Sequence, residues 1–92
     1  MIYIGNSLQF KGEYDAAIES YSKAIALAPT CAEAHNNLGN ASENQRNLQA
    51  AVKSYTQALV YQPENKATQN NLIRACQQLG VTDSAKDRTD RP

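Results

Sequence analysis

The sequence repeats itself at an interval of 34 residues. Shifting it by one interval superimposes residues of the same type: Gly5 on Gly39, Asn6 on Asn40, Ala17 on Ala51, Ser20 on Ser54, Tyr21 on Tyr55, Ala24 on Ala58 and Pro29 on Pro63. A second shift places Asn36, Asn37 and Leu38 on Asn70, Asn71 and Leu72. A fixed period of this length is typical of a solenoid, in which helix pairs stack and each pair buries its apolar face against the next.

Apolar residues within each interval recur three and four positions apart, which predicts amphipathic helices. The expected helices cover the start of the chain up to a break at Lys11 and Gly12, then about Tyr14 to Ala28, Cys31 to Gln45, Leu48 to Tyr61 and Lys66 to Leu79. We therefore expect an all-α fold, an α-solenoid of antiparallel helix pairs. The repeat domain spans residues 1–80, with repeats at about 1–31 and 32–65, a capping helix at 66–80, and a polar tail at 81–92 that is expected to be disordered.

Turn residues mark the ends of these helices. Gly12 can adopt the left-handed conformation that ends a helix, and Gly80 is expected to do so at the end of the last helix, with Val81 as its hydrophobic contact. Arg46 stands where Gly12 stood one repeat earlier, and a positive φ there would be strained, so Asn47 is the alternative for that role.

The third helix is expected to begin with a capping box. Thr30 is followed three residues later by Glu33, so each side chain can satisfy a free backbone N–H of the first turn. Pro29 ends the preceding helix, and Pro63 ends the fourth helix in the same way.

Composition excludes several classes of function. Nine Lys and Arg balance nine Asp and Glu, so the net charge gives no general electrostatic footprint for nucleic acid or an anionic membrane. No apolar run is long enough to span a bilayer, and no signal peptide is recognisable. Cys31 and Cys76 do not have a metal-site or redox-motif spacing, so we expect no metal, no cofactor, a reducing compartment and a cytoplasmic location.

A family pattern runs through the repeats. In order, it consists of a large residue, Leu-Gly, Tyr, Ala, Tyr or Phe, Ala and Pro. The central repeat meets it with His35, Leu38, Gly39, Ser42, Ala51, Tyr55, Ala58 and Pro63, the first with Met1, Ile4, Gly5, Leu8, Ala17, Tyr21, Ala24 and Pro29, and the third with Gln69, Leu72, Cys76 and Gly80. Over about residues 1–80 the chain resembles tetratricopeptide repeats, with two full repeats and a capping helix. The departures are His35 and Gln69 for the usual aromatic residue and Ser42 for the usual Tyr.

This resemblance implies a right-handed superhelix with close packing inside each pair. In the central repeat, Gly39 is expected to let the first helix approach Ala51, while Tyr55 fills the space between successive pairs. Gly5, Ala17 and Tyr21 are expected to do the same in the first repeat.

The resemblance also implies a concave face lined by the first helix of each pair, where side-chain amides dominate. Ile2, Gln9, Glu33, Gln77 and Gln78 belong to this face, and the candidate peptide-binding residues are Tyr3, Asn6, Phe10, Asn36, Asn37, Asn40, Asn44, Asn70, Asn71 and Arg74. An amide offers donors and an acceptor to the main chain of an extended peptide. Asn37 and Asn71 occupy equivalent positions, similar to the asparagine ladder of O-linked N-acetylglucosamine transferase. The chain is therefore expected to bind a protein or peptide partner, unless these asparagines are merely solvated.

Two other binding readings remain open. A structural or self-assembly scaffold could associate through the ends of the array, since Ile73 stands where Gly5 and Gly39 stood; the protein would then be a weak homo-oligomer instead of a monomer. A carboxylate clamp for chaperone C-termini resembles the chain at Asn6 and Asn37. Its cationic positions, however, hold Ile2, Ala67 and Asn71, and Arg74 lies one turn away.

No enzyme is indicated. His35 is expected to be a partly buried packing residue, and Cys76 a core residue. No base accompanies Cys31, and no group of metal ligands clusters in the sequence.

Overall fold

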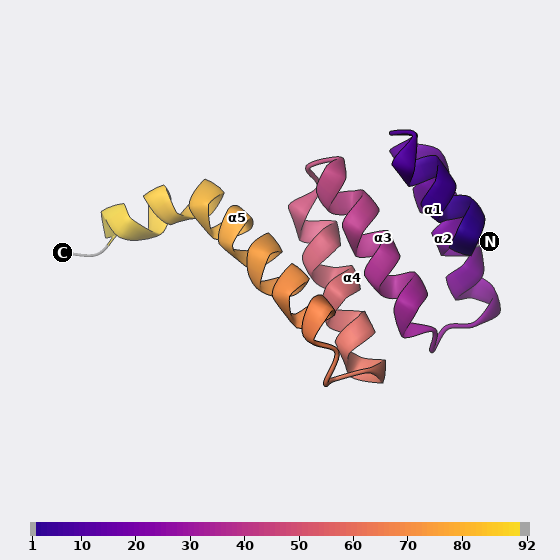
Figure 1. The fold of residues 1–92 in the computed structure, drawn as a ribbon. Coiled ribbons are helices and arrows are strands. Elements are labelled where there is room, and N and C mark those ends of the chain that lie inside the picture. Colours follow the sequence, from indigo (N-terminus) through magenta and orange to yellow (C-terminus); the bar gives the residue numbers. More distant parts are fainter. Residues whose placement is uncertain (1, 91–92) are drawn as a thin grey trace.

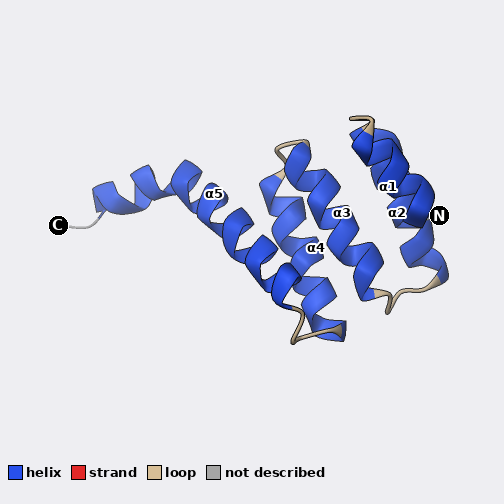
Figure 2. Cartoon of the chain, in the orientation of Figure 1, coloured by secondary structure: helices blue, strands red, loops and turns tan. Residues whose placement is uncertain are grey.

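The computed structural model describes the backbone of residues 2–90 and the side chains of residues 4–80. Five helices follow one another: α1 (Ile2–Phe10), α2 (Tyr14–Leu27), α3 (Ala32–Asn44), α4 (Leu48–Tyr61) and α5 (Lys66–Asp90). This part of the chain contains no strand (Figure 2). The predicted all-α repeat fold is confirmed.

The helices stack in chain order (Figure 1). Each helix packs against the next, and α1 also contacts α3, which in turn contacts α5. Within the described residues, no Cα atom of α2 lies within 8 Å of a Cα atom of α4. Because α1, α3 and α5 approach one another while α2 and α4 stay apart, the array curves towards the former three. We call the side formed by α1, α3 and α5 the inner face.

Prolines end the second helix of each pair. Ala28 and Gln62 precede Pro29 and Pro63 and have φ of −141° and −136°, outside the helical region. A residue before proline is pushed away from the helical conformation by the pyrrolidine ring. The ends of α2 and α4 thus follow from the sequence almost to the residue.

The turn inside each pair needs a left-handed residue. Gly12 has φ +84° and Arg46 has φ 67°. Both turns close with the same backbone bond, from Glu13 N–H to the Leu8 carbonyl and from Asn47 N–H to the Ser42 carbonyl, each 2.9 Å. Arg46 therefore carries the strained conformation, and the alternative that Asn47 would take it is wrong.

The helix starts differ from the expected capping. Cys31 precedes α3 without a side-chain cap, so the capping box of Thr30 and Glu33 does not form. Two asparagines act as caps instead. Asn47 Oδ1 accepts from Ala50 N–H at 3.2 Å, and Asn65 Oδ1 accepts from Thr68 N–H at 3.1 Å.

Helix α5 continues past its predicted end. Gly80 has no positive φ, and the helix runs to Asp90, so the expected helix end at Gly80 is wrong. No proline lies between Lys66 and Asp90 to interrupt the backbone hydrogen bonds. The division of the chain at residue 80 stays a prediction, and Val81 lies outside the described side chains.

The core consists of two clusters of small and aromatic residues. One joins α1, α2 and α3 and contains Ala17, Tyr21 and Ala41 with Leu8, Ile18 and Leu38 packed against them. The other joins α4 and α5 and contains Ala51, Tyr55 and Ala75 with Val52 and Leu72. Each second helix therefore buries its stripe against the first helix of the following unit.

A glycine in each pair makes room for a tyrosine ring of the same pair. A Cβ placed on Gly5 would lie 2.5 Å from the Tyr21 ring, and one on Gly39 would lie 2.6 Å from the Tyr55 ring. Optimal carbon contacts are about 3.5–4.0 Å. The Tyr55 ring contacts Gly39 of its own pair and also packs with Ala75 and Leu72 of α5, so its predicted place between successive pairs is confirmed. The predicted contact of Gly39 with Ala51 stays a prediction.

We expect Gly39→Ala to destabilise the fold by about 1–3 kcal/mol, because the added methyl group must displace the Tyr55 ring. The matched control is Gly80→Ala, where a Cβ meets nothing within 4 Å. That change should leave stability unaltered or raise it by up to about 1 kcal/mol, since alanine favours a helix. Urea unfolding of both variants measures the difference. Equal stability would contradict the packing of Tyr55 on Gly39.

Replacing Arg46 by glycine should stabilise the chain by about 0.5–1 kcal/mol, because glycine removes the steric cost of the left-handed conformation. The converse change, Gly12→Arg, should destabilise by a similar amount, as open space surrounds Gly12 and only the backbone is strained. Thermal melts of both variants check the pair. A loss of stability in Arg46→Gly would show that the arginine side chain outweighs its backbone strain.

Candidate functional site

A groove of about 270 Å³ opens on the inner face between α1 and α3. Its lining consists of Asn6, Gln9 and Phe10 from α1 and Asn37, Asn40 and Asn44 from α3. We call this the amide groove. Five of its six side chains carry an amide and none carries a charge, so it offers hydrogen bonds without a net electrostatic field.

A buried tyrosine holds the α1 wall of the amide groove in place. The Tyr21 hydroxyl lies 2.5 Å from Asn6 Oδ1 and 3.0 Å from Gln9 Oε1. Burial, and then the nearby Glu33 carboxylate, raise the pKa of Tyr21, so the hydroxyl keeps its proton and acts as the donor. Because these contacts use the amide oxygens, the NH₂ groups of Asn6 and Gln9 remain to donate to an occupant of the groove.

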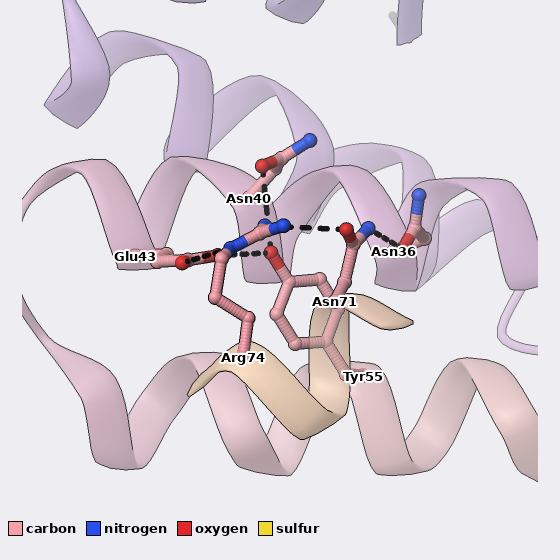
Figure 3. Close-up of polar contacts among 6 residues, drawn as sticks. All are labelled: Asn36, Asn40, Glu43, Tyr55, Asn71 and Arg74. Atoms are coloured by element: carbon pink, nitrogen blue, oxygen red, sulfur yellow. Dashed lines mark hydrogen bonds and ion pairs between the residues drawn. The ribbon is translucent and has the colours of Figure 1, made fainter. Parts of the chain in front are cut away.

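The contact between α3 and α5 is built on an ion pair (Figure 3). Arg74 Nε lies 2.7 Å from Glu43 Oε2, and Arg74 Nη2 lies 2.9 Å from Glu43 Oε1. The Tyr55 hydroxyl donates to Glu43 Oε1 at 2.8 Å, while Asn40 Oδ1 is a more distant acceptor at 3.4 Å. The Glu43 carboxylate thus receives three hydrogen bonds from two helices.

These contacts shift the pKa values of the groups involved. Hydrogen bonding from Arg74 lowers the pKa of Glu43 below 4.5, against the opposing effect of burial. Burial, together with the adjacent Glu43 carboxylate, raises the pKa of Tyr55 above its usual 10.0. Glu43 is therefore ionised and Tyr55 protonated at neutral pH.

Amides extend the same network along α5. Asn36 Oδ1 accepts from Thr68 Oγ1 and from Asn71 Nδ2, both at 3.1 Å. Asn71 Oδ1 accepts from Arg74 Nη2 at 3.2 Å. We call this set the α3–α5 seam: Asn36, Glu43, Tyr55, Thr68, Asn71 and Arg74. Its side chains connect two repeats, and most of their hydrogen-bonding groups already have partners within the chain.

The predicted site residues therefore divide into two groups. Asn6, Phe10, Asn37, Asn40 and Asn44 line the amide groove, whereas Asn36, Asn71 and Arg74 belong to the α3–α5 seam. Asn70 is exposed outside both, and Tyr3 lies outside the described side chains.

Asn37 and Asn71 are equivalent residues one repeat apart, but only Asn71 has hydrogen-bond partners among the described residues, and the asparagine ladder stays a prediction. Asn71 donates to Asn36, but the residue one repeat before Asn36 is Ile2, which has no hydrogen-bonding side chain. The equivalent bond from Asn37 therefore has no acceptor. Asn37 stays half-buried in the amide groove, without a hydrogen-bond partner among the described residues.

Sequence reasoning missed Glu43 as the partner of Arg74. Glu43 stands at the position held by Gln9 in the first repeat, and Arg74 at the position held by Asn6 and Asn40. In the second repeat an acid replaces an amide, and in the third a base does so. This exchange of neutral for oppositely charged side chains was a signal that Glu43 and Arg74 form an ion pair. The pairing also removes the cation that a carboxylate clamp would need.

Two other predictions have clear outcomes. His35 is structural, as expected: it is 9% exposed, its Nε2 lies 2.8 Å from the Pro29 carbonyl oxygen, and its ring stacks on Tyr61. Gln69 makes the equivalent bond to Pro63 at 2.7 Å. Cys76, by contrast, is exposed, so its assignment to the core is wrong.

Other classes of site are not evident in the described part of the chain. No three His, Cys, Asp or Glu side chains there come close enough to hold a metal ion. None of the helices, over the residues described, has the length and hydropathy needed to cross a membrane.

Comparison with known families agrees with the repeat. A family model described as a TPR repeat matches residues 5–46, and one described as Tetratricopeptide repeat matches residues 32–65. Together the two cover residues 5–65, which include α2, α3 and α4 completely. Among curated proteins, none matches the chain.

A double-mutant cycle of Glu43→Gln and Arg74→Gln should give a coupling of about 1–2 kcal/mol at neutral pH. This is the lower part of the range for hydrogen bonds to charged groups, because the Arg74 side chain is 47% exposed. Since the pKa of Glu43 is lowered in the folded state, the coupling is complete above its ordinary value of 4.5 and decreases as the pH falls below that value.

Chemical denaturation across this pH range measures the coupling. The control is the cycle of Glu19→Gln and Lys23→Gln, an exposed pair at 3.5 Å that should show much weaker coupling. A Glu43–Arg74 coupling no larger than that of the control would contradict a structural role for the ion pair.

Proposed function

Because the chain belongs to the tetratricopeptide repeat family, whose repeats generally mediate protein–protein interactions, we propose that its amide groove binds an extended segment of a protein partner. The proposed role is binding, without a catalytic step. The single observation that carries it is the gathering of five amide side chains and one exposed aromatic ring in one groove on the inner face.

The polar part of the groove matches a peptide main chain. Asn37 and Asn44 have no hydrogen-bond partner among the described residues, and Asn6 and Gln9 keep their NH₂ groups as donors. An extended peptide presents N–H and C=O groups in alternation, and an amide side chain can pair with both. Recognition of this kind depends on backbone geometry more than on partner sequence.

The apolar part of the groove is Phe10, which is 93% exposed at the edge of the amides. A large exposed aromatic side chain next to hydrogen-bonding groups is typical of an interaction hot spot. We infer that one apolar side chain of the partner packs on Phe10 while the adjoining main chain lies along α3.

A second candidate function is self-assembly through the open side of α5, favoured by the 54% exposure of Ile73. A single exposed aliphatic residue is common on monomers, so this candidate has weaker support than the amide groove. Self-assembly is tested with a substitution at Ile73, whereas peptide binding is tested with substitutions in the amide groove. One experiment can therefore distinguish the two functions.

The test begins with selection of linear peptides from a random library on the intact chain. Affinity of a selected peptide is then measured by fluorescence anisotropy. Asn37→Ala and Asn44→Ala should each weaken binding by about two- to tenfold, which corresponds to one hydrogen bond. Phe10→Ala should weaken it further, and binding should change little with salt because no charge lines the groove.

The matched control is Gln49→Ala, which removes an exposed amide of α4 outside the amide groove and should leave affinity unchanged. N-methylation of the peptide backbone should reduce affinity if main-chain bonds matter. Affinity that survives in all three groove variants contradicts the proposal. A loss seen only in Ile73→Lys, with concentration-dependent sedimentation, would favour self-assembly.

A further inference from the structure

A second and larger hollow lies on the other side of the array, between α2 and α4 and above α3. Its volume is about 540 Å³, and its lining is Asp15, Ile18, Ser22, Ile25, His35, Leu38, Ser42, Gln45, Asn47, Ala50, Lys53, Ser54 and Gln57. We call it the α2–α4 groove. It shares no residue with the amide groove, so the two can be tested separately.

Small residues create this hollow. Ser42 occupies the position that Leu8 fills in the first repeat, and Leu8 packs against the core cluster there. Ala50 and Ser54 on α4 are small as well, and the described backbones of α2 and α4 stay more than 8 Å apart between Cα atoms. The space that a large side chain would fill is thus left open above α3.

The lining of the α2–α4 groove combines aliphatic side chains with buried serines. Ile18, Ile25 and Leu38 line the groove as half-buried aliphatic side chains. Ser42 and Ser54 are only 4% and 8% exposed, and neither has a hydrogen-bond partner among the described residues. Neither hydroxyl oxygen is sealed off from the groove, so both can hydrogen-bond to an occupant.

The rim carries two opposite charges, one on each side of the groove. Asp15, on the α2 side, accepts a hydrogen bond from Gln45 Nε2. Lys53, on the α4 side, has no ion-pair partner among the described residues. An occupant of the groove therefore meets a free cation next to apolar walls.

The length of the groove favours a peptide over a compact molecule. Its α2 wall runs from Asp15 to Ile25, which at about 1.5 Å per helical residue spans about 15 Å. A single aromatic ring occupies only part of that length, whereas a chain segment of several residues fills it.

We propose that the α2–α4 groove is a second docking site, for a partner segment that carries a tyrosine beside an acidic residue. The tyrosine ring packs on Ile18, Ile25 and Leu38, and its hydroxyl exchanges hydrogen bonds with Ser42 and Ser54. The adjacent carboxylate pairs with Lys53. A partner that reaches both grooves would gain affinity through their simultaneous occupation.

Three tetrapeptides with blocked ends test the chemistry: Ala-Glu-Tyr-Ala, Ala-Glu-Phe-Ala and Ala-Gln-Tyr-Ala. Each is titrated to millimolar concentration against the intact chain, and NMR shifts of the Ile18, Ile25 and Leu38 methyl groups report binding. The first peptide should bind most tightly. Loss of the hydroxyl should weaken binding by about two- to tenfold, and loss of the carboxylate by up to about fivefold, with a greater effect at low salt.

Variants of the chain assign each contribution. Ser42→Leu should fill the hollow and abolish binding, and leucine is acceptable at this position in the first repeat. Ser42→Ala keeps the space and should reduce the preference for tyrosine over phenylalanine. Lys53→Gln should erase the preference for glutamate over glutamine, whereas the control Lys66→Gln, outside the groove, should retain it.

Several outcomes would overturn the docking site. These are methyl groups that do not shift at millimolar peptide, equal affinity for the three peptides, or full binding by a folded Ser42→Leu variant. If Ser42→Leu fails to fold, the tyrosine preference of Ser42→Ala decides the matter. The amide-groove variants Asn37→Ala and Asn44→Ala should bind the tetrapeptides normally, so failure of one proposal leaves the other standing.

Discussion

The contact on which the rest of the structure depends is the close approach of a tyrosine ring to a glycine of the same helix pair. Tyr21 crosses Gly5 and Tyr55 crosses Gly39, at distances that leave no space for a methyl group. The ring lies in the core while its hydroxyl reaches the polar side chains of the inner face. A single residue type thus sets the spacing of each helix pair and the orientation of the groups that the partner would meet.

Much of the fold could be predicted from the sequence, because the signals are local and repeated. The prolines at 29 and 63 and the left-handed turn at Gly12 fixed the helix ends, and the apolar stripe fixed which side of α4 is buried. The end of α5 could not be predicted, since glycine permits a helix end without requiring one. Periodicity shows which face of a helix is buried but not every residue that the face contacts, which is why the packing of the Tyr55 ring on Gly39 was not predicted.

The candidate site was predicted in outline and not in detail for a related reason. Helical spacing places Asn37, Asn71 and Arg74 on one face, but it does not show whether a neighbouring repeat already uses their hydrogen bonds. This depends on the residue that the preceding repeat supplies. Asn36 accepts a hydrogen bond from Asn71, whereas the equivalent residue for Asn37 is Ile2, which cannot accept one. Glu43 and Arg74 replace amides of the preceding repeats and form an ion pair. The inner face is therefore divided into the open amide groove and the hydrogen-bonded α3–α5 seam.

The α3–α5 seam also affects which helices of a repetitive chain dock against each other during folding. Near-identical units can dock one interval out of step, since α5 carries a stripe that would also fit against α2. In such a slipped arrangement Arg74 would face Gln9, the residue equivalent to Glu43, and Glu43 would lose its cation. The slipped arrangement would therefore lose the two charge-assisted hydrogen bonds from Arg74 to Glu43. The ion pair therefore favours docking of α5 on α3 over docking on α2, although both helices would accept the same apolar stripe.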